Sequence, residues 1–287
     1  MRAVSSRRAN RPRKRNCSET FPRVKVAQPA AGCVHSGHRR RWFPPTVPDI
    51  DALQAECSAL RNDQTVLALG LSHDLRAPLR AIDSFAYLLE QRSAQALDDT
   101  GRDHLHRIRE ASARMGRLLA RLQVYLHAGS APLHVDDLDL TLLADWCVAE
   151  LRDAAPDREA HIDIAPNLRA RGDERLLKTA IAELLHNAWT YAAADRPVHI
   201  VVDAEQSARG TTLRIRDHGE GFDPALATRL GEPFQRLSAQ AHPEGCGLGV
   251  AIARRIAQRH GGTVQVEGRI GEGATASLFM PNAAEPE

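Results

Sequence analysis

A histidine and an aspartate, His73 and Asp74, stand side by side in the sequence SHDLRAPLR. His73 lies two positions from Leu71 and from Leu75, about 200° around a helix from each, so its imidazole points away from the apolar face of that helix. Asp74 can hydrogen-bond one ring nitrogen and leave the other free to act as a nucleophile. Pro78 interrupts the helical hydrogen bonds one turn later, and a proline inside a regular apolar stripe argues against an ordinary surface histidine. We therefore predict a nucleophilic histidine at position 73.

A second polar pair, Glu183 and Asn187, stands in the sequence ELLHNA. The two residues are four apart and so share one face of a helix. A carboxylate and an amide oxygen on one face can hold a hard cation such as Mg²⁺, which keeps several waters and bridges substrate phosphates. The alternative, two solvated polar groups at the edge of a helix, stays open at this point.

One glycine-rich segment, DHGEGF, follows a predicted strand. It begins with Asp217, which could accept a hydrogen bond from an exocyclic amine, and Gly219 and Gly221 let the backbone approach a ligand closely. Farther along, the sequence PFQRL places Phe234 ahead of the polar stretch 238–243. A mobile lid that is anchored by one aromatic side chain has this pattern.

A second glycine-rich segment, EGCGLG, contains Gly245, Gly247, Leu248 and Gly249 at the start of a predicted helix. The first amides of a helix and its positive dipole end favour phosphate groups. The segment lacks the GK[ST] of a P-loop, and it does not follow a strand as a dinucleotide-binding loop does. We therefore predict a phosphate-binding loop of another kind.

These residues depend on two kinds of element for their positions, and the first is a pair of long helices. Apolar residues three or four apart predict one helix over about 49–92 and a second that runs through Leu126, joined by a short polar link around Asp98–Gly101. The first stripe is Leu67, Leu71, Leu75, Leu79, Ile82, Phe85 and Leu89; the second is Leu105, Ile108, Met115, Leu118, Leu122 and Leu126. A lone hairpin cannot bury both stripes, so we expect two copies to form a four-helix bundle.

The second kind of element is a series of alternating strands and helices after residue 132. We predict strands near residues 134–140, 160–164, 197–204, 211–217, 263–268 and 274–280, and helices near 141–154, 173–193 and 247–260. This pattern is typical of an α/β domain of about 150 residues whose sheet packs helices on one face.

Composition and charge exclude several classes of protein. Residues 1–48 hold 12 Lys and Arg against one acid, a net charge of +11, whereas the other residues hold 26 against 35, a net charge of −9. The basic segment lacks hydrophobic periodicity, so we expect a disordered tail; a nucleic-acid or membrane-surface tail, a targeting peptide and sequence upstream of the true start stay open. We take the basic charge as no evidence of nucleic-acid binding. No window approaches the ~20 apolar residues of a membrane-inserted helix, no secretory signal is present, and five scattered cysteines suit a reducing cytoplasm.

In their order, these segments resemble the motifs of two-component sensor histidine kinases, over about residues 60–282. The H-box, N-box, first glycine box, F-box and second glycine box are similar to Ser72–Leu79, Glu183–Tyr191, Asp217–Gly221, Pro233–Leu237 and Gly245–Gly249. The H-box is most similar to that of phytochrome-like kinases. The resemblance implies a HisKA-type α-helical hairpin that dimerises into a four-helix bundle, followed by an α/β sandwich of the GHKL (Bergerat) ATPase type, the HATPase_c domain.

The resemblance also implies roles for residues and two cofactors, ATP and Mg²⁺. His73 would be the phosphoacceptor and Asp74 its general base. Asn187 would hold Mg²⁺ with support from Glu183, and Asp217 would bind the adenine amine. The other nucleotide contacts would come from Gly219, Gly221, Phe234, Gly245, Gly247, Leu248 and Gly249.

Three positions depart from the family pattern. Ala77 stands where the family commonly has Thr or Asn, thought to position water for phosphatase action, so we predict weak phosphatase activity toward the regulator. Thr190 replaces a basic residue and removes one possible phosphate contact, for which Arg236 could compensate. Glu183 replaces an Asn and is the residue type with which related ATPases activate water, but we assign it to Mg²⁺ support.

The resemblance implies a dimerisation and phosphotransfer domain at 49–129 and an ATP-binding domain at 133–282, with tails at 1–48 and 283–287. The partners would be a second copy of the chain, the receiver domain of a separate response regulator, and an unknown upstream sensor, since residues 49–69 are too few for a sensory module. We expect a cytoplasmic enzyme. Two alternatives are a non-catalytic phosphotransfer or scaffold protein and a GHKL-type ATPase without histidine phosphorylation.

Overall fold

A computed structural model of the chain describes residues 50–93, 97–193, 195–236 and 245–282. The chain divides into two units, 1–48 and 49–287, and all that follows concerns the second. The expected tails at 1–48 and 283–287 and the predicted lid stretch at 238–243 lie outside the described residues.

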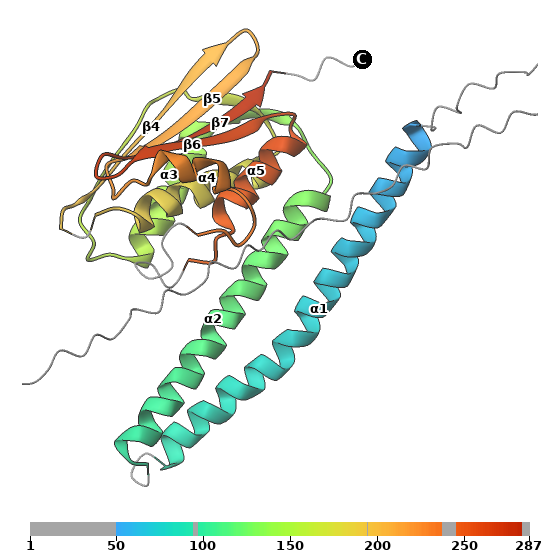
Figure 1. Cartoon of the computed structure of the whole chain (residues 1–287). Helices are drawn as coiled ribbons and strands as arrows, with labels where there is room; N and C mark the ends of the chain where they lie inside the picture. The colour runs from blue at the N-terminus through green and yellow to red at the C-terminus, as the bar shows by residue number, and fades with distance from the viewer. Residues whose placement is uncertain (1–49, 94–96, 194, 237–244, 283–287) are drawn as a thin grey trace, which may run out of the picture. The chain divides into compact units, whose positions relative to one another are not determined.

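Two long helices open the described part of the chain: α1 spans Ile50–Ser93 and α2 spans Asp99–Ser130 (Figure 1). Both helices were predicted and are confirmed. The side chain of Asp98 caps α2 by accepting a hydrogen bond from the amide of Gly101 at 2.7 Å. Because α2 begins at Asp99, Gly101 lies in its first turn, and the connecting link ends earlier than the predicted Asp98–Gly101.

The two helices contact each other through residues seven apart. The buried positions are Ser72, Leu79 and Ala86 on α1 and Leu105, Ser112, Leu119 and Leu126 on α2. The hydroxyl of Ser112 donates to the carbonyl oxygen of Leu79 at 3.2 Å. A seven-residue repeat keeps one seam facing its partner along a helix pair. Small side chains at several of these positions let the two helices approach closely, and apolar periodicity alone does not reveal them.

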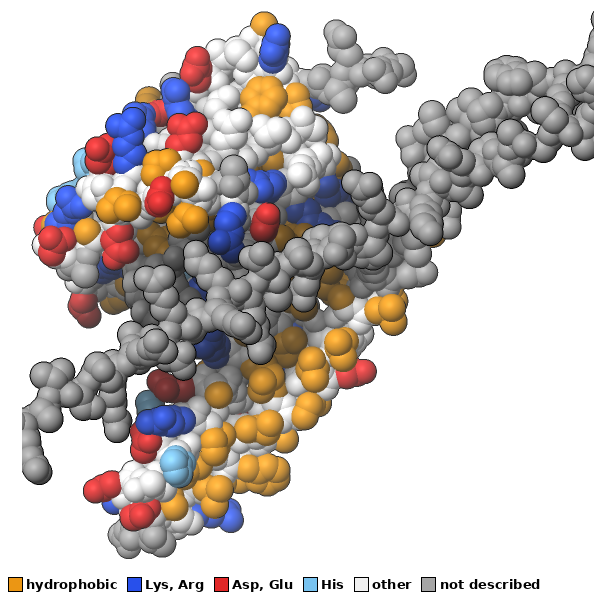
Figure 2. Space-filling model, in the orientation of Figure 1, with side chains coloured by type: hydrophobic (Ala, Val, Ile, Leu, Met, Phe, Trp, Pro, Cys, Tyr) orange, Lys and Arg blue, Asp and Glu red, His pale blue; other side chains and the backbone are white. Residues whose placement is uncertain are grey.

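Most of the predicted apolar stripe of α1 faces away from α2. Leu79 is buried, but the other six members are exposed: Leu67, Leu71, Leu75, Ile82, Phe85 and Leu89. Ile108 and Met115 of α2 are exposed as well. Figure 2 shows a row of apolar side chains along the hairpin. The single chain thus leaves this stripe without a protein surface to cover it among the described residues.

The α/β part contains a five-stranded sheet in the order β2-β4-β5-β7-β6. Its strands are β2 Ala160–Ile164, β4 Val198–Ser207, β5 Gly210–Asp217, β6 Thr263–Arg269 and β7 Gly273–Pro281. β2 and β4 are parallel and the other pairs are antiparallel. The strand predicted at 134–140 is the shorter β1, Asp136–Asp139, which pairs with β3, Arg169–Gly172, a strand that we did not predict.

Three helices cover one face of the sheet, as predicted (Figure 1). They are α3 Leu140–Ala154, α4 Glu174–Thr190 and α5 Gly249–Arg259, and α4 and α5 are shorter than the predicted 173–193 and 247–260. A short 3-10 helix, η1 at Pro224–Arg229, was not predicted. The core between helices and sheet includes Leu177, Ile181, Leu184, Ile200, Leu213, Ile215, Ile252, Ile256 and Leu278.

The C-terminal end of α2 packs against this α/β part. Ala128 is 2% exposed and belongs to the same hydrophobic core. The guanidinium of Arg255 on α5 lies 4.5 Å from the ring centre of Tyr125, a cation–π contact. In the described part of the chain, no helix combines the length and the apolar character that a membrane crossing requires.

Candidate active site

His73 projects from α1 into solvent, as the helical pattern predicted. Its side chain is 80% exposed, and its Nδ1 lies 3.2 Å from Oδ1 of Asp74. The preceding residue, Ser72, is buried against α2 and donates to the carbonyl oxygen of Ala68 at 2.7 Å. A buried residue on one side of the helix and an exposed histidine beside it fix the direction of the imidazole. When Nδ1 carries the proton and donates to Asp74, the lone pair on Nε2 is free for nucleophilic attack.

A cavity of about 420 Å³ lies beside α4 and the beginning of α5. Its walls also come from α2, from residues of β5, β6 and β7, and from the segments around η1 and Gly245. Ile215, Val266 and Ala276 give it an apolar lining, while Asn187 and Asp217 add polar groups. An apolar slot with a few polar groups at its edge suits a flat, partly polar ligand of this volume.

Six of the predicted binding residues line this cavity: Asn187, Asp217, Gly221, Gly245, Gly247 and Gly249. The other three do not. Leu248 is fully buried at the start of α5, and Gly219 is buried beneath the carbonyl group of Tyr191. Phe234 is 56% exposed and its amide donates to the carbonyl oxygen of Gly247 at 2.9 Å. These three residues shape the backbone around the cavity, and their predicted roles in binding stay predictions.

Asp217 is held in place by two backbone amides at the end of β5. Its Oδ1 accepts hydrogen bonds from the amides of Gly219 at 2.9 Å and Ala274 at 3.2 Å. Burial raises the pKa of this carboxyl group above its usual value, and the two amides oppose that rise. Because both amides bind Oδ1, Oδ2 is the oxygen that can accept a hydrogen bond from a ligand in the cavity.

Two glycines permit close approach at the cavity wall. Gly221 has φ of +63°, and a Cβ atom there would collide with the carbonyl oxygen of Arg269. At Gly249, a Cβ atom would lie 3.1 Å from both the amide oxygen of Asn187 and a carboxylate oxygen of Glu183. The absence of a side chain at Gly249 therefore lets the start of α5 pack closely against the two polar residues of α4.

Glu183 is almost completely buried, with 7% of its side chain exposed, and it pairs with Arg121 of α2. The guanidinium Nη1 lies 2.6 Å from Oε1, and Nη2 also hydrogen-bonds Oε2. Burial raises the pKa of Glu183, and the Arg121 charge opposes the rise. Its predicted support of Mg²⁺ stays a prediction, since its carboxylate is bound by an arginine in this structure.

Sequence reasoning missed the contribution of α2 to this cavity. Arg117, Ala120 and Arg121 line it, although none of them belongs to a motif. They lie on the polar side of an amphipathic helix, where arginines are common on any solvent-exposed surface. The sequence therefore held no local signal that could have identified them.

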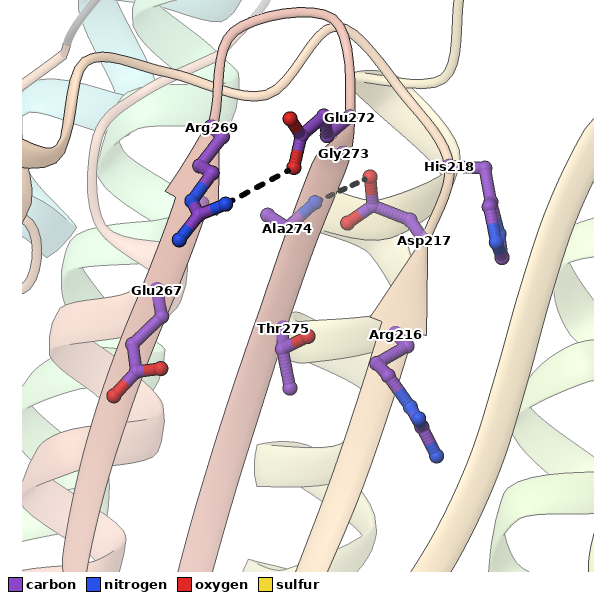
Figure 3. A pocket seen from close by; sticks show the side chains of 10 residues that line it. Arg216, Asp217, His218, Glu267, Arg269, Glu272, Gly273, Ala274 and Thr275 are labelled. Atoms are coloured by element: carbon purple, nitrogen blue, oxygen red, sulfur yellow. Dashed lines mark hydrogen bonds and ion pairs between the residues drawn. The ribbon is translucent and has the colours of Figure 1, made fainter.

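A smaller cavity of about 280 Å³ lies on the opposite face of the sheet (Figure 3). Arg216, Thr275 and Glu267 stand side by side there on β5, β7 and β6. Figure 3 shows Asp217 joined to the amide of Ala274, and Arg269 facing Glu272, with 3.7 Å between Nη1 and Oε2. Asp217 contributes to the lining of both cavities.

Two family models match the chain. The histidine kinase-, DNA gyrase B- and HSP90-like ATPase model matches residues 172–284, which contain α4, the sheet apart from β2, and α5. The His Kinase A (phospho-acceptor) domain model matches residues 63–125, which contain His73 and most of the hairpin.

Curated proteins and a solved structure are similar to this chain over most of its length. The phytochrome-like protein Cph1 of Synechocystis sp. is 26% identical over 73% of this chain and 28% of its own length. The sensor-like histidine kinase SenX3 of Mycobacterium tuberculosis is 30% identical over 92% of this chain and 66% of its own length. Full-length ShkA, in a crystal structure with AMPPNP, has a TM-score of 0.55 and 24% identity over 76% of this chain and 46% of that chain, a likeness of fold. The chain therefore spans about a quarter to two thirds of the curated relatives' length.

Proposed function

Because the chain belongs to the sensor histidine kinases of two-component systems, we propose that it transfers the γ-phosphoryl group of ATP to His73. The phosphoryl group then passes to an aspartate on the receiver domain of a separate response regulator. One observation carries this proposal. A single chain combines an exposed histidine paired to a carboxylate with a cavity of nucleotide size that is lined by Asn187 and Asp217.

The chemical step on this chain centres on His73 and Asp74. Nε2 attacks the γ-phosphorus, a P–N bond forms, the bond to the β–γ bridging oxygen breaks, and ADP leaves. Asp74 accepts the proton of Nδ1 as the ring becomes positively charged, because its Oδ1 already lies 3.2 Å from that nitrogen. In the second step the P–N bond breaks as the phosphoryl group moves to the regulator's carboxylate oxygen, Asp74 returns the proton to Nδ1, and His73 is again a neutral imidazole.

The cavity residues bind and orient the nucleotide. Asp217 accepts a hydrogen bond from the adenine amine through Oδ2, and the apolar lining at Ile215 and Val266 contacts the base. The glycines and amides at the start of α5 bind phosphate oxygens, since a helix N-terminus favours anions. Together they bring the γ-phosphorus into a defined position, which supplies much of the rate in phosphoryl transfer.

The polar residues of α4 suit a hard cation. Asn187 lines the cavity and carries an amide oxygen, a ligand that Mg²⁺ accepts, and Gly249 lines the cavity next to it. Asn187 would hold Mg²⁺, and the ion would neutralise phosphate charge during transfer. Glu183 lies next to it, and its part in holding the ion depends on its pairing with Arg121.

The partners of this activity follow from its chemistry. A receiver domain must supply the accepting aspartate, and a second copy must cover the exposed stripe of α1. An upstream partner supplies the signal. We place the reaction in the cytoplasm, where ATP and the regulator are found.

The test is incubation of the full chain with Mg²⁺ and ATP labelled at the γ-phosphorus. We expect a label on the protein that acid removes and base does not, and that is lost in His73→Gln. His104→Gln is the matched control, because His104 is also exposed, on α2, and is expected to leave labelling unchanged. Sustained ATP hydrolysis without labelled protein would instead favour an ATPase. The absence of both labelling and hydrolysis would favour a scaffold.

A further inference from the structure

One face of α2 is turned toward the nucleotide cavity. Arg117, Arg121, Tyr125 and Ala128 follow each other at intervals of four, four and three residues, the spacing of one helical face. Ala128 lies in the core, and its carbonyl oxygen accepts from Nη1 of Arg259 at 3.4 Å. Because packing fixes the C-terminal part of this face, the positions of Arg117 and Arg121 along the cavity are fixed as well.

Arg121 binds both oxygens of the buried carboxylate of Glu183. The pair joins α2 to α4, and 30% of the Arg121 side chain and 7% of the Glu183 side chain are exposed. A planar guanidinium that meets a carboxylate at two points forms a strong and directional ion pair. Removing one partner of such a pair destabilises the fold when the other charge stays buried.

The same carboxylate lies close to the amide of Asn187 at the start of α5, although Glu183 itself does not line the cavity. A Cβ atom on Gly249 would lie 3.1 Å from Oε2 of Glu183 and 3.1 Å from Oδ1 of Asn187, so the two oxygens face one point at the start of α5. A cation held by Asn187 would therefore lie within reach of Glu183. Arg121 and the cation compete for one negative charge.

We infer that Arg121 is a positioning residue that decides whether Glu183 is available to the metal-bound nucleotide. While Arg121 pairs with Glu183, α2 is fastened to the ATP domain and Glu183 is withheld from the cation. When a magnesium nucleotide takes Glu183 as a ligand, Arg121 is released and this contact between α2 and α4 is lost. The two events are linked, so each weakens the other by the same factor. The inference rests on the proposed function only in requiring that the cavity binds a magnesium nucleotide.

The experiment measures the affinity of the full chain for the fluorescent analogue trinitrophenyl-ATP, once with Mg²⁺ and once with EDTA. The ratio of the two affinities is the gain due to magnesium. We expect Arg121→Gln to increase this gain at least about fivefold, since couplings of this kind are typically 5–150-fold. Glu183→Gln should reduce the gain below the native value. Arg121→Lys should lie between Arg121→Gln and the native chain, because it keeps the charge and loses the two-point geometry.

The double variant separates this role from a merely structural one. If Arg121 acts through Glu183, adding Arg121→Gln to Glu183→Gln changes the magnesium gain no further. This comparison also covers the case in which Arg121→Gln alone fails to fold, because the double variant leaves no buried charge unpaired. Arg114→Gln is the matched control: Arg114 lies two turns earlier on α2, is exposed, and does not line the cavity.

Failure of this inference and failure of the proposed function give different results. The role of Arg121 would be overturned if Arg121→Gln left the magnesium gain unchanged. It would also be overturned if Arg121→Gln changed the gain equally in the native chain and in the Glu183→Gln variant. In either case labelling of His73 would still stand. Binding with the expected gains but no label on His73 would overturn the kinase and keep the role of Arg121. A native chain that binds no nucleotide would overturn both.

Discussion

At the scale of single residues, the surroundings of His73 favour phosphorylation of the histidine over hydrolysis of the regulator's phosphoryl group. Asp74 lies within hydrogen-bond distance of Nδ1 and can take a proton as the ring is phosphorylated. Ala77 lies four residues after His73 on the same face of α1 and is exposed. Its methyl group cannot orient a water molecule, so the chain offers a base for phosphorylation and no side chain at this position for hydrolysis.

We therefore expect the native chain to dephosphorylate its regulator slowly, and Ala77→Thr to accelerate this reaction at least about tenfold, because one positioned hydrogen-bonding group is commonly worth that much or more. The measurement is the loss of label from a phosphorylated receiver domain in the presence of ADP. Ala77→Val is the control, since it has the shape of Thr without the hydroxyl. Fast dephosphorylation by the native chain, or equal rates for the Thr and Val variants, would contradict the argument.

At the scale of secondary structure, the start of α4 is set by one buried carboxylate. Oδ1 of Asp173 accepts from the amide of Leu176 at 3.1 Å and caps the helix, and Oδ2 accepts from the amide of His134 at 3.0 Å. The amide of Asp173 itself donates to Nε2 of His260 at 3.0 Å, at the end of α5. Because α4 carries Asn187, this cap also positions the predicted cation site.

Asp173→Ala is expected to lower the free energy of unfolding by about 1–2 kcal/mol, as loss of a helix cap does, with a further loss from the unpaired amide of His134. Asp173→Asn keeps an oxygen for the cap and should cost less.

Burial by itself would raise the pKa of Asp173, but the amides of His134 and Leu176 and the nearby Arg175 hold it below the usual value. A lowered pKa stabilises the fold above the ordinary aspartate pKa and ceases to do so as the pH falls through the folded value.

The stability difference between the native chain and Asp173→Asn should therefore be full near neutral pH and shrink below about pH 4, where the unfolded aspartate takes up a proton. Thermal or urea unfolding at several pH values measures this. A difference that grows toward acid pH would show that the charge of Asp173 is not what stabilises the fold.

The elements that could be predicted from the sequence are those with a strong period. α1, α2 and the long strands of the sheet have one. β3 does not, because RARG holds no apolar run and is a strand only through its pairing with β1. The α1 surface that faces α2 was also hidden, since Ser72 and Ala86 are not recognised as core residues by hydrophobicity. In the site, glycines and polar pairs in motifs were found, whereas Arg121 depends on a tertiary contact that no local pattern encodes.

At the scale of the whole molecule, the uncovered stripe of α1 is the feature that a single chain leaves unexplained. Leu67 is 72% exposed and Phe85 is 67% exposed, and they belong to a stripe that continues over several turns. Contiguous apolar surface of this kind marks a contact with another protein. A second hairpin presents the same stripe, and two such hairpins bury both stripes in a four-helix bundle.

We expect the full chain to be a dimer, of twice its mass of 31.5 kDa, and Phe85→Glu to shift it toward monomer, because a charge in the centre of the bundle has to be buried without a partner. Sedimentation equilibrium over a range of concentrations measures this shift. Leu142→Glu is the matched control: Leu142 is 65% exposed on α3, so a charge there should leave the dimer intact. Helical content from circular dichroism distinguishes dissociation from unfolding. A native chain that stays monomeric, or a Phe85→Glu variant that dimerises as tightly as the native chain, would show that this stripe is not the dimer interface.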